Sequence, residues 1–190
     1  MSDKQNKKIT FMQNIPNLIS AFRILLVVVF AILFVNKRYI YCIAVYVFAF
    51  LSDILDGYIA RKNNWITSLG KLLDPLADKL MLLTALVCFS IEGWVPVWIT
   101  VFIMLKEVLL CLFGSILYVK KMVVEADLSG KAATGLWTLA VLSVLLQNYY
   151  TAISAITSIL IICAFVVSIL AALNYSFRYL ILPSKPTKEE

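Results

Sequence analysis

Four aspartates stand close together in a chain that is otherwise strongly apolar: Asp53, Asp56, Asp74 and Asp78. Ionisable groups inside apolar, membrane-length segments are energetically costly, and they normally serve a function. The sequence contains no histidine, and four carboxylates repel one another unless a multivalent cation neutralises them. Oxygen ligands select hard cations such as Mg²⁺ or Mn²⁺. We therefore predict a metal site, in which two ions roughly 4 Å apart would stabilise the attacking and leaving oxygens of a phosphoryl transfer.

The residues around the aspartates suit a phosphate ester. Gly57 and Ala60 lack bulk, so a flat base or a backbone can approach that helix closely. Arg61 offers a fork of donors that matches phosphate. Gly70 precedes the next apolar span and can begin a helix whose free amides face an anion. Without histidine, a carboxylate is the natural general base for an attacking hydroxyl. We assign this role to Asp78, which lies deepest in its span.

The elements that must position these groups are expected to be transmembrane helices. The chain has 190 residues, of which 62% are hydrophobic, and its apolar runs approach the ~20 residues that cross a bilayer core. We predict an all-α membrane protein with six spans: 15–35, 39–60, 72–91, 94–118, 132–147 and 151–173. They form one catalytic domain, 15–173, between a short amphipathic N-terminal segment, 1–14, and a tail, 174–190.

The distribution of basic residues predicts the orientation of these spans. Six spans place both termini on one side of the membrane. The loop between the second and third spans is on that side, and the opposite side has only Lys37 and Arg38. The positive-inside rule therefore predicts that both termini and the active site are cytoplasmic. The net charge of +6 then reflects topology and contact with lipid head groups, not nucleic acid. The basic residues of the cytoplasmic side are Lys4, Lys7, Lys8, Arg61, Lys62, Lys71, Lys120, Lys121, Lys131, Arg178, Lys185 and Lys188.

Helical spacing brings the aspartates together in pairs. Asp53 and Asp56 are three residues apart, and Asp74 and Asp78 are four apart, so each pair shares one face of a helix. The loop between the two helices is short enough to make them antiparallel neighbours. We expect the two acidic faces to meet near the cytoplasmic edge of the membrane.

This pattern resembles the signature of the CDP-alcohol phosphatidyltransferase family at every position: Asp53-x2-Asp56-Gly57-x2-Ala60-Arg61-x8-Gly70-x3-Asp74-x3-Asp78. Residues 14–20 with Arg23, and residues 69–79, are similar to the branch that contains phosphatidylglycerophosphate synthases and cardiolipin synthases. The resemblance covers most of the chain and weakens after Leu117.

The resemblance implies a six-helix homodimer, which we expect in a bacterial cell membrane. It also implies that CDP-diacylglycerol is the donor and that an acceptor hydroxyl attacks its β-phosphate to release CMP. The four aspartates would hold two Mg²⁺ or Mn²⁺ ions in each protomer, with Asp78 also serving as the base. The residues that would line the nucleotide site are Gly57, Ala60, Arg61 and Gly70.

The acceptor is less strongly indicated. Phosphatidylglycerophosphate synthases usually carry an Arg-Glu pair in the fourth helix, an arginine two turns on, and Gly-Lys-x-Lys-Thr at the start of the fifth. This chain has Lys106-Glu107, then Gly114, and Ala133 in place of the second lysine. Two cations are thus missing, and each phosphate contact contributes roughly 1.5–3 kcal/mol. We predict glycerol 3-phosphate as the acceptor and keep phosphatidylglycerol, as in cardiolipin synthases, as the alternative. The candidate acceptor or supporting residues are Asn17, Ser20, Arg23, Lys71, Lys106 and Lys131.

Some of these residues have structural explanations as well. Arg23 could extend to the membrane interface instead of contacting a substrate. Lys106 and Glu107 are adjacent, and adjacent helical positions point apart, so we expect no simple ion pair between them. A divalent-cation transporter or channel is the alternative of another class, because acidic side chains in membranes also line permeation paths.

Overall fold

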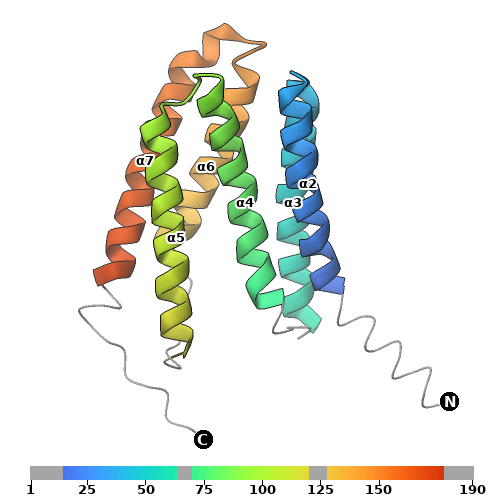
Figure 1. The fold of residues 1–190 in the computed structure, drawn as a ribbon, viewed down its shortest axis with the longest axis vertical. Coiled ribbons are helices and arrows are strands. Elements are labelled where there is room, and N and C mark those ends of the chain that lie inside the picture. The colour runs from blue at the N-terminus through green and yellow to red at the C-terminus, as the bar shows by residue number, and fades with distance from the viewer. Residues whose placement is uncertain (1–14, 64–69, 120–127, 178–190) are drawn as a thin grey trace, which may run out of the picture. The chain divides into compact units, whose positions relative to one another are not determined.

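The computed structural model describes residues 15–63, 70–119 and 128–177, with side chains over 22–54, 79–112 and 129–177 (Figure 1). This part of the chain is helical and contains no strand, which confirms the all-α class. The predicted segment 1–14 and the tail beyond residue 177 lie outside the described residues. The elements are α2 (Ile15–Val35), α3 (Tyr39–Asn63), α4 (Gly70–Ile91), α5 (Val97–Val119), α6 (Leu128–Leu146), the short 3-10 helix η1 (Thr151–Ile153) and α7 (Ser154–Ser176).

Two of the described helical segments are long and apolar enough to cross a membrane by themselves, Ser129–Leu146 and Thr151–Ser176. Shorter apolar stretches occur in three other helices: Phe22–Val35 in α2, Tyr39–Ile54 in α3 and Lys79–Ile91 in α4. The helices begin and end within a few residues of the predicted spans, so the apolar runs located them correctly.

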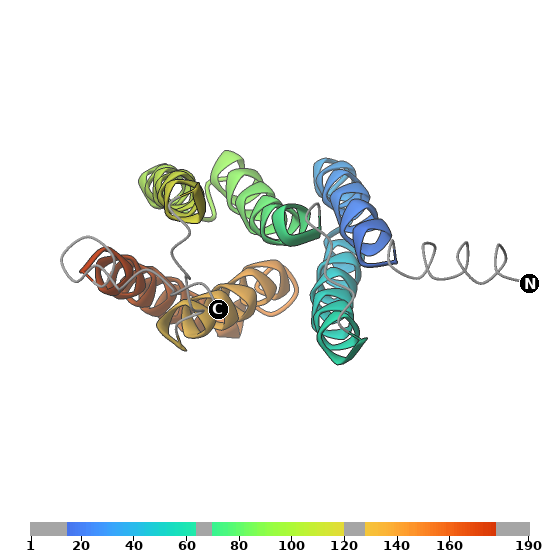
Figure 2. The same ribbon diagram turned by 90° about the horizontal axis from the view of Figure 1, so that it is seen from below.

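The chain divides into two compact units, Met1–Cys88 and Phe89–Glu190. In the first unit α2 and α3 lie side by side (Figure 2) and pack along a seam of buried side chains. On α3 the buried positions are Cys42, Tyr46 and Ala49, and the ring of Tyr46 lies 6.1 Å from that of Phe30 on α2. On α2 the seam follows steps of three and four residues, which keeps it on one helical face. Its buried positions are Arg23, Leu26, Val27, Phe30 and Phe34.

The turn between α2 and α3 is a Schellman motif with a lysine at its left-handed position. Arg38 N–H donates to Leu33 C=O at 2.9 Å and Lys37 N–H donates to Phe34 C=O at 2.8 Å, the two bonds that define the motif. Lys37 has φ +57°, a conformation that usually requires glycine. Asn36 supports the turn, because its side-chain amide donates to Ile32 C=O at 2.7 Å.

A second turn of the same type joins α4 to α5. Trp94 N–H donates to Phe89 C=O at 2.8 Å and Gly93 N–H donates to Ser90 C=O at 3.2 Å. Here the left-handed residue is a glycine, Gly93 at φ +75°. The hydroxyls of Ser90 and Thr100 lie 2.6 Å apart and link the two helices beside the turn. The predicted break at Glu92-Gly93 is confirmed.

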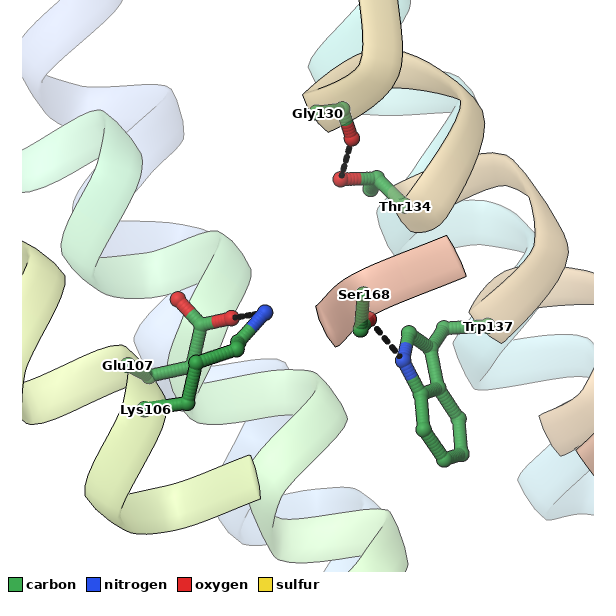
Figure 3. Close-up of polar contacts among 6 residues, drawn as sticks. All are labelled: Lys106, Glu107, Gly130, Thr134, Trp137 and Ser168. Atoms are coloured by element: carbon green, nitrogen blue, oxygen red, sulfur yellow. Dashed lines mark hydrogen bonds and ion pairs between the residues drawn. The ribbon is translucent and has the colours of Figure 1, made fainter. Parts of the chain in front are cut away.

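In the second unit α6 packs against α7, and both helices bury polar as well as apolar side chains. On α7 the buried positions are Thr157, Ile161, Ala164 and Ser168. The indole N–H of Trp137 on α6 donates to Ser168 Oγ at 2.8 Å, and both residues are buried. Figure 3 shows this bond between the two helices. Buried indole and hydroxyl groups need such partners, so this bond fixes the register of α6 on α7.

Candidate active site

The aspartate motif lies on two consecutive helices of the first unit. Asp53 and Asp56 belong to the C-terminal part of α3, and Asp74 and Asp78 belong to the first turns of α4. In Figure 1 the end of α3 and the start of α4 lie at the same end of this unit as the start of α2. The side chain of Asp53 is described, whereas those of Asp56, Asp74 and Asp78 lie outside the described residues.

Asp53 is held by an arginine from the neighbouring helix. Nη1 of Arg23 on α2 lies 2.8 Å from Oδ1 of Asp53, and the side chains are 1% and 32% exposed, respectively. Arg23 is therefore inside the α2–α3 seam, while part of Asp53 stays accessible. The alternative in which Arg23 extends to the membrane interface is wrong, because its side chain is buried against Asp53. A buried guanidinium needs a fixed carboxylate partner. Asp53 supplies it, because it follows the buried Ala49 by four residues and so lies on the same face of α3.

The spacing of the seam is the sequence signal that could have predicted this ion pair. On α2, Arg23 precedes Val27 and Phe30 by four and seven residues, which continues the buried face. On α3, Asp53 follows Ala49 and Tyr46 by the same intervals. In an antiparallel helix pair the two ends of such seams oppose each other. Reading Arg23 as a candidate substrate contact missed this internal partner.

The chemistry of the donors fits a hard divalent cation. Asp53 offers a partly exposed carboxylate, and the other three motif residues are also aspartates on α3 and α4. Carboxylate oxygens are the ligands that Mg²⁺ and Mn²⁺ prefer. Among the side chains that the structure describes, no group of three or more histidine, cysteine, aspartate or glutamate residues is close enough to hold a metal. The complete ligand set therefore remains a prediction.

The predicted nucleotide residues occupy the end of α3 and the start of α4. Gly57, Ala60 and Arg61 belong to the last turns of α3. Gly70 is the first residue of α4. A helix start presents amides without an intrahelical acceptor, and these can receive an anion. The side chains of Ala60 and Arg61 lie outside the described residues.

Lys106, a predicted acceptor residue, and its neighbour Glu107 are arranged differently from expectation. Lys106 Nζ lies 2.6 Å from Glu107 Oε1, and the side chains are only 11% and 12% exposed. Figure 3 shows the two side chains of α5 turned toward each other. The expectation that these neighbours form no simple pair is wrong. Both side chains are long, so their charged ends can meet although their Cα–Cβ bonds diverge, and low exposure strengthens the attraction.

The other predicted acceptor residues lie on three helices. Asn17 and Ser20 belong to α2 and Lys71 to α4, with side chains outside the described residues. Lys131 is exposed in the first turn of α6. Ala133, where a second lysine would be expected, is buried in α6 at 5% exposure. Of the candidate phosphate-binding lysines with described side chains, Lys131 is thus the one that is open to solvent.

Comparison with known proteins agrees with the motif. The family model for CDP-alcohol phosphatidyltransferase matches residues 13–170, well beyond Leu117. The chain is 29% identical over 169 residues to the CDP-diacylglycerol–glycerol-3-phosphate 3-phosphatidyltransferase of Aquifex aeolicus, covering 87% of this chain and 95% of the relative. It is 32% identical over 152 residues to the protein of the same name from Bacillus subtilis, covering 72% and 79%.

A relative with a different name is also similar. The human cardiolipin synthase (CMP-forming) is 36% identical over 109 residues, which cover 56% of this chain and 35% of the relative. The family match spans most of the chain and includes every position of the aspartate motif. The protein is an enzyme, and it belongs to the CDP-alcohol phosphatidyltransferase family.

Proposed function

We propose that this enzyme transfers the phosphatidyl group of CDP-diacylglycerol to glycerol 3-phosphate, giving phosphatidylglycerol phosphate and CMP. The observation that carries the proposal is the complete aspartate motif in the C-terminal part of α3 and the first turns of α4. The relatives from Aquifex aeolicus and Bacillus subtilis, which are named for this reaction, align over 95% and 79% of their own length. The cardiolipin synthase described above aligns over about a third of its length. This difference favours glycerol 3-phosphate as the acceptor.

The motif residues would divide the work between binding and chemistry. Asp53, Asp56, Asp74 and Asp78 would hold Mg²⁺ or Mn²⁺, two ions in each protomer. When bound, these ions would neutralise charge on the diphosphate of the donor. The last turns of α3 and the first turn of α4 would line the nucleotide, through the small residues Gly57, Ala60 and Gly70 and the guanidinium of Arg61.

The reaction balances with one proton acceptor. The oxygen of the acceptor hydroxyl attacks the β-phosphorus of CDP-diacylglycerol and forms a new P–O bond. The bond from that phosphorus to the oxygen bridging the two phosphates breaks, and CMP leaves with that oxygen. Asp78 accepts the hydroxyl proton as the general base. The products are the phosphodiester lipid, CMP and a proton that Asp78 returns to water.

The membrane arrangement is part of the proposal. Each of α2, α3, α4, α5 and α7 has 21 to 25 residues. At 1.5 Å per residue such helices extend about 31–38 Å, enough for a hydrocarbon core of roughly 30 Å. With α6 they would make six spans in a bacterial cell membrane, with both termini and the active site at the cytoplasmic side. A homodimer follows from the family resemblance.

A specific observation keeps a second acceptor open. The charge of Lys106 is already balanced by Glu107 at 2.6 Å, and no cation stands at Gly114 or Ala133. An acceptor phosphate would have to compete with Glu107 for Lys106. A lipid acceptor such as phosphatidylglycerol, which reacts through a head-group hydroxyl, depends less on these positions.

The test is release of CMP by the purified, detergent-solubilised enzyme. CDP-diacylglycerol and Mg²⁺ are supplied with one acceptor at a time: glycerol 3-phosphate, phosphatidylglycerol, inositol phosphate or serine. We expect CMP with glycerol 3-phosphate, and faster release than with the other three. The matched control is Asp78→Asn, which keeps the size of the side chain but cannot accept the proton, and it should lose at least about a hundredfold in rate.

Other outcomes of this assay would contradict the proposal in different ways. Fast CMP release with phosphatidylglycerol alone would make the enzyme a cardiolipin synthase. Metal-dependent ion flux in liposomes without CMP release under any condition would replace the transferase with a cation transporter. A near-wild-type rate for Asp78→Asn would remove Asp78 as the base and leave the reaction itself intact.

A further inference from the structure

The ion pair between Arg23 and Asp53 lies in the packed seam of α2 and α3, toward the end that carries the motif. The seam is otherwise apolar and aromatic, with Phe30 and Tyr46 at its centre. The side chain of Arg23 is 1% exposed, so water does not hydrate its charge. Removing that hydration costs free energy unless a carboxylate lies opposite the guanidinium. A leucine at this position would complete the seam at lower cost. The charge therefore points to a role beyond packing.

The geometry of the pair is asymmetric. Arg23 is enclosed, whereas Asp53 keeps about a third of its side chain exposed. Arg23 thus contacts Asp53 from inside the helix pair at Oδ1 and leaves part of the carboxylate accessible. An acceptor molecule arriving from solvent would meet Asp53 and not the guanidinium. This distinguishes Arg23 from a residue that binds substrate directly.

We propose that Arg23 is a positioning residue for the metal site: it fixes the orientation of the Asp53 carboxylate so that the exposed part can bind a divalent cation. The inference rests on the proposed function, in which Asp53 is a metal ligand. Groups that hydrogen-bond to metal ligands orient them, and losing such a group typically lowers metal affinity ten- to a hundredfold. Arg23 acts through Asp53 and touches neither metal nor substrate.

The sign of the effect separates positioning from a simple charge effect. A guanidinium next to Asp53 also repels an incoming cation. If Arg23 served only to neutralise Asp53, its removal would tighten metal binding. If Arg23 orients Asp53, its removal would weaken metal binding. The two explanations predict opposite changes in the same measurement.

The experiment measures Mn²⁺ affinity of the purified, full-length protein in detergent, from the electron paramagnetic resonance signal of free Mn²⁺. We expect Arg23→Gln to weaken Mn²⁺ binding ten- to a hundredfold and Arg23→Lys, which can still reach Oδ1 with one donor, to lie between it and the wild type. Arg38→Gln is the matched control, because Arg38 is an exposed arginine of the same helix pair, in the turn between α2 and α3. Its affinity should equal that of the wild type.

A double-mutant cycle tests whether Arg23 acts through Asp53. In an Asp53→Asn background, Arg23→Gln should cause no further loss of Mn²⁺ affinity. The double variant replaces the ion pair with two amides and leaves no buried charge unpaired. If Arg23→Gln alone does not fold, as judged by size-exclusion chromatography and helical circular dichroism, Arg23→Lys supplies the same cycle.

Each outcome decides the inference. Unchanged or tighter Mn²⁺ binding by Arg23→Gln would overturn it, as would an equal loss in the Asp53→Asn background. If the wild type binds Mn²⁺ and releases CMP while Arg23→Gln keeps its affinity, only the positioning role fails. If the wild type binds no Mn²⁺, the positioning role and the metal site of the proposed function fail together. Mn²⁺ binding that depends on Arg23, without CMP release, would support the positioning role and contradict the proposed reaction.

Discussion

Lys106 is the residue on which the acceptor question can be tested most directly. Its ammonium lies against Glu107 at 2.6 Å, with little exposure of either side chain. In the proposed reaction Lys106 shares its charge between Glu107 and the phosphate of glycerol 3-phosphate. A hydrogen bond to a charged group contributes roughly 1.5–3 kcal/mol. Loss of this lysine should therefore affect the acceptor phosphate and spare acceptors that lack one.

We expect Lys106→Gln to raise the KM for glycerol 3-phosphate by about ten- to a hundredfold, with a smaller change in kcat. Glutamine can still donate to Glu107, so no buried carboxylate loses its donor. Lys37→Gln is the matched control, because Lys37 is an exposed cation in the turn after α2, and its KM should not change. Steady-state CMP release at varied glycerol 3-phosphate gives both constants. An unchanged KM for Lys106→Gln would exclude Lys106 from acceptor binding.

At the residue scale, the sequence indicates the chemistry of the aspartate motif more readily than it indicates which charged side chains form ion pairs. Carboxylates without histidine indicate a hard metal whatever the fold, so the aspartates stand out from sequence alone. The Arg23–Asp53 and Lys106–Glu107 pairs depend on where long side chains extend, and rules based on Cα–Cβ direction do not determine that. Arg23 was predicted as a candidate acceptor or supporting residue, and its partner Asp53 emerges only when α2 and α3 are packed against each other.

Helix boundaries illustrate what local sequence determines. α2 spans the predicted residues 15–35, because its apolar run is followed directly by the turn residues Asn36 and Lys37. α5 begins three residues later than predicted, since the chain from Gly93 to Pro96 forms the turn after α4. α6 begins at Leu128, earlier than its apolar run, because Ser129, Gly130 and Lys131 are polar or small yet still helical. Apolar runs locate a helix, and its ends depend on backbone hydrogen bonds that hydropathy does not record.

The two Schellman turns allow a matched test of backbone strain. Lys37 at φ +57° and Gly93 at φ +75° have the same role in two turns. A Cβ at Gly93 would meet no atom within 4 Å, so Gly93→Ala changes only backbone freedom. The left-handed conformation costs an L-residue roughly 1–2 kcal/mol. We expect Gly93→Ala to lower stability by about 1 kcal/mol and Lys37→Gly to raise it by up to that amount.

Thermal unfolding in detergent, followed by circular dichroism, measures both changes. Lys37→Ala is the control for the lysine, because it removes the charge but keeps the left-handed strain, and its midpoint should not rise. A Gly93→Ala midpoint equal to that of the wild type would show that the turn tolerates a side chain without cost. A rise for Lys37→Ala as large as that for Lys37→Gly would assign the gain to charge and not to backbone conformation.

For the whole molecule, the strongest prediction from sequence concerns orientation. The helical class is confirmed, and two of the described segments satisfy the length and hydropathy of a span unaided. Other helices contain charged groups for which we propose a role in the reaction, such as Asp53 in α3 and Lys106 in α5. Such charges interrupt the apolar runs, so hydropathy alone does not identify these helices as membrane spans. Basic residues beyond the ends of the predicted spans carry the predicted orientation signal instead.

The predicted six-span topology can be tested with single cysteines. The four native cysteines, Cys42, Cys88, Cys111 and Cys163, all lie within helices and can be replaced by alanine. In this background we expect Lys37→Cys, Glu92→Cys and Tyr149→Cys to react with a membrane-impermeant maleimide in intact bacterial cells. Lys185→Cys should react only after the cells are permeabilised. These positions follow the first, third, fifth and sixth predicted spans, in that order.

The pattern of labelling also locates any error. Lys37 and Glu92 are separated by two predicted spans, and so are Glu92 and Tyr149, so each pair must lie on the same side. If Tyr149→Cys alone required permeabilisation, an odd number of crossings would separate it from Glu92, and α5 or α6 would not span the membrane. If all three required permeabilisation while Lys185→Cys did not, the orientation would be inverted. The motif at the α3–α4 ends would then face outward, away from cytoplasmic glycerol 3-phosphate, and the proposed acceptor would be excluded.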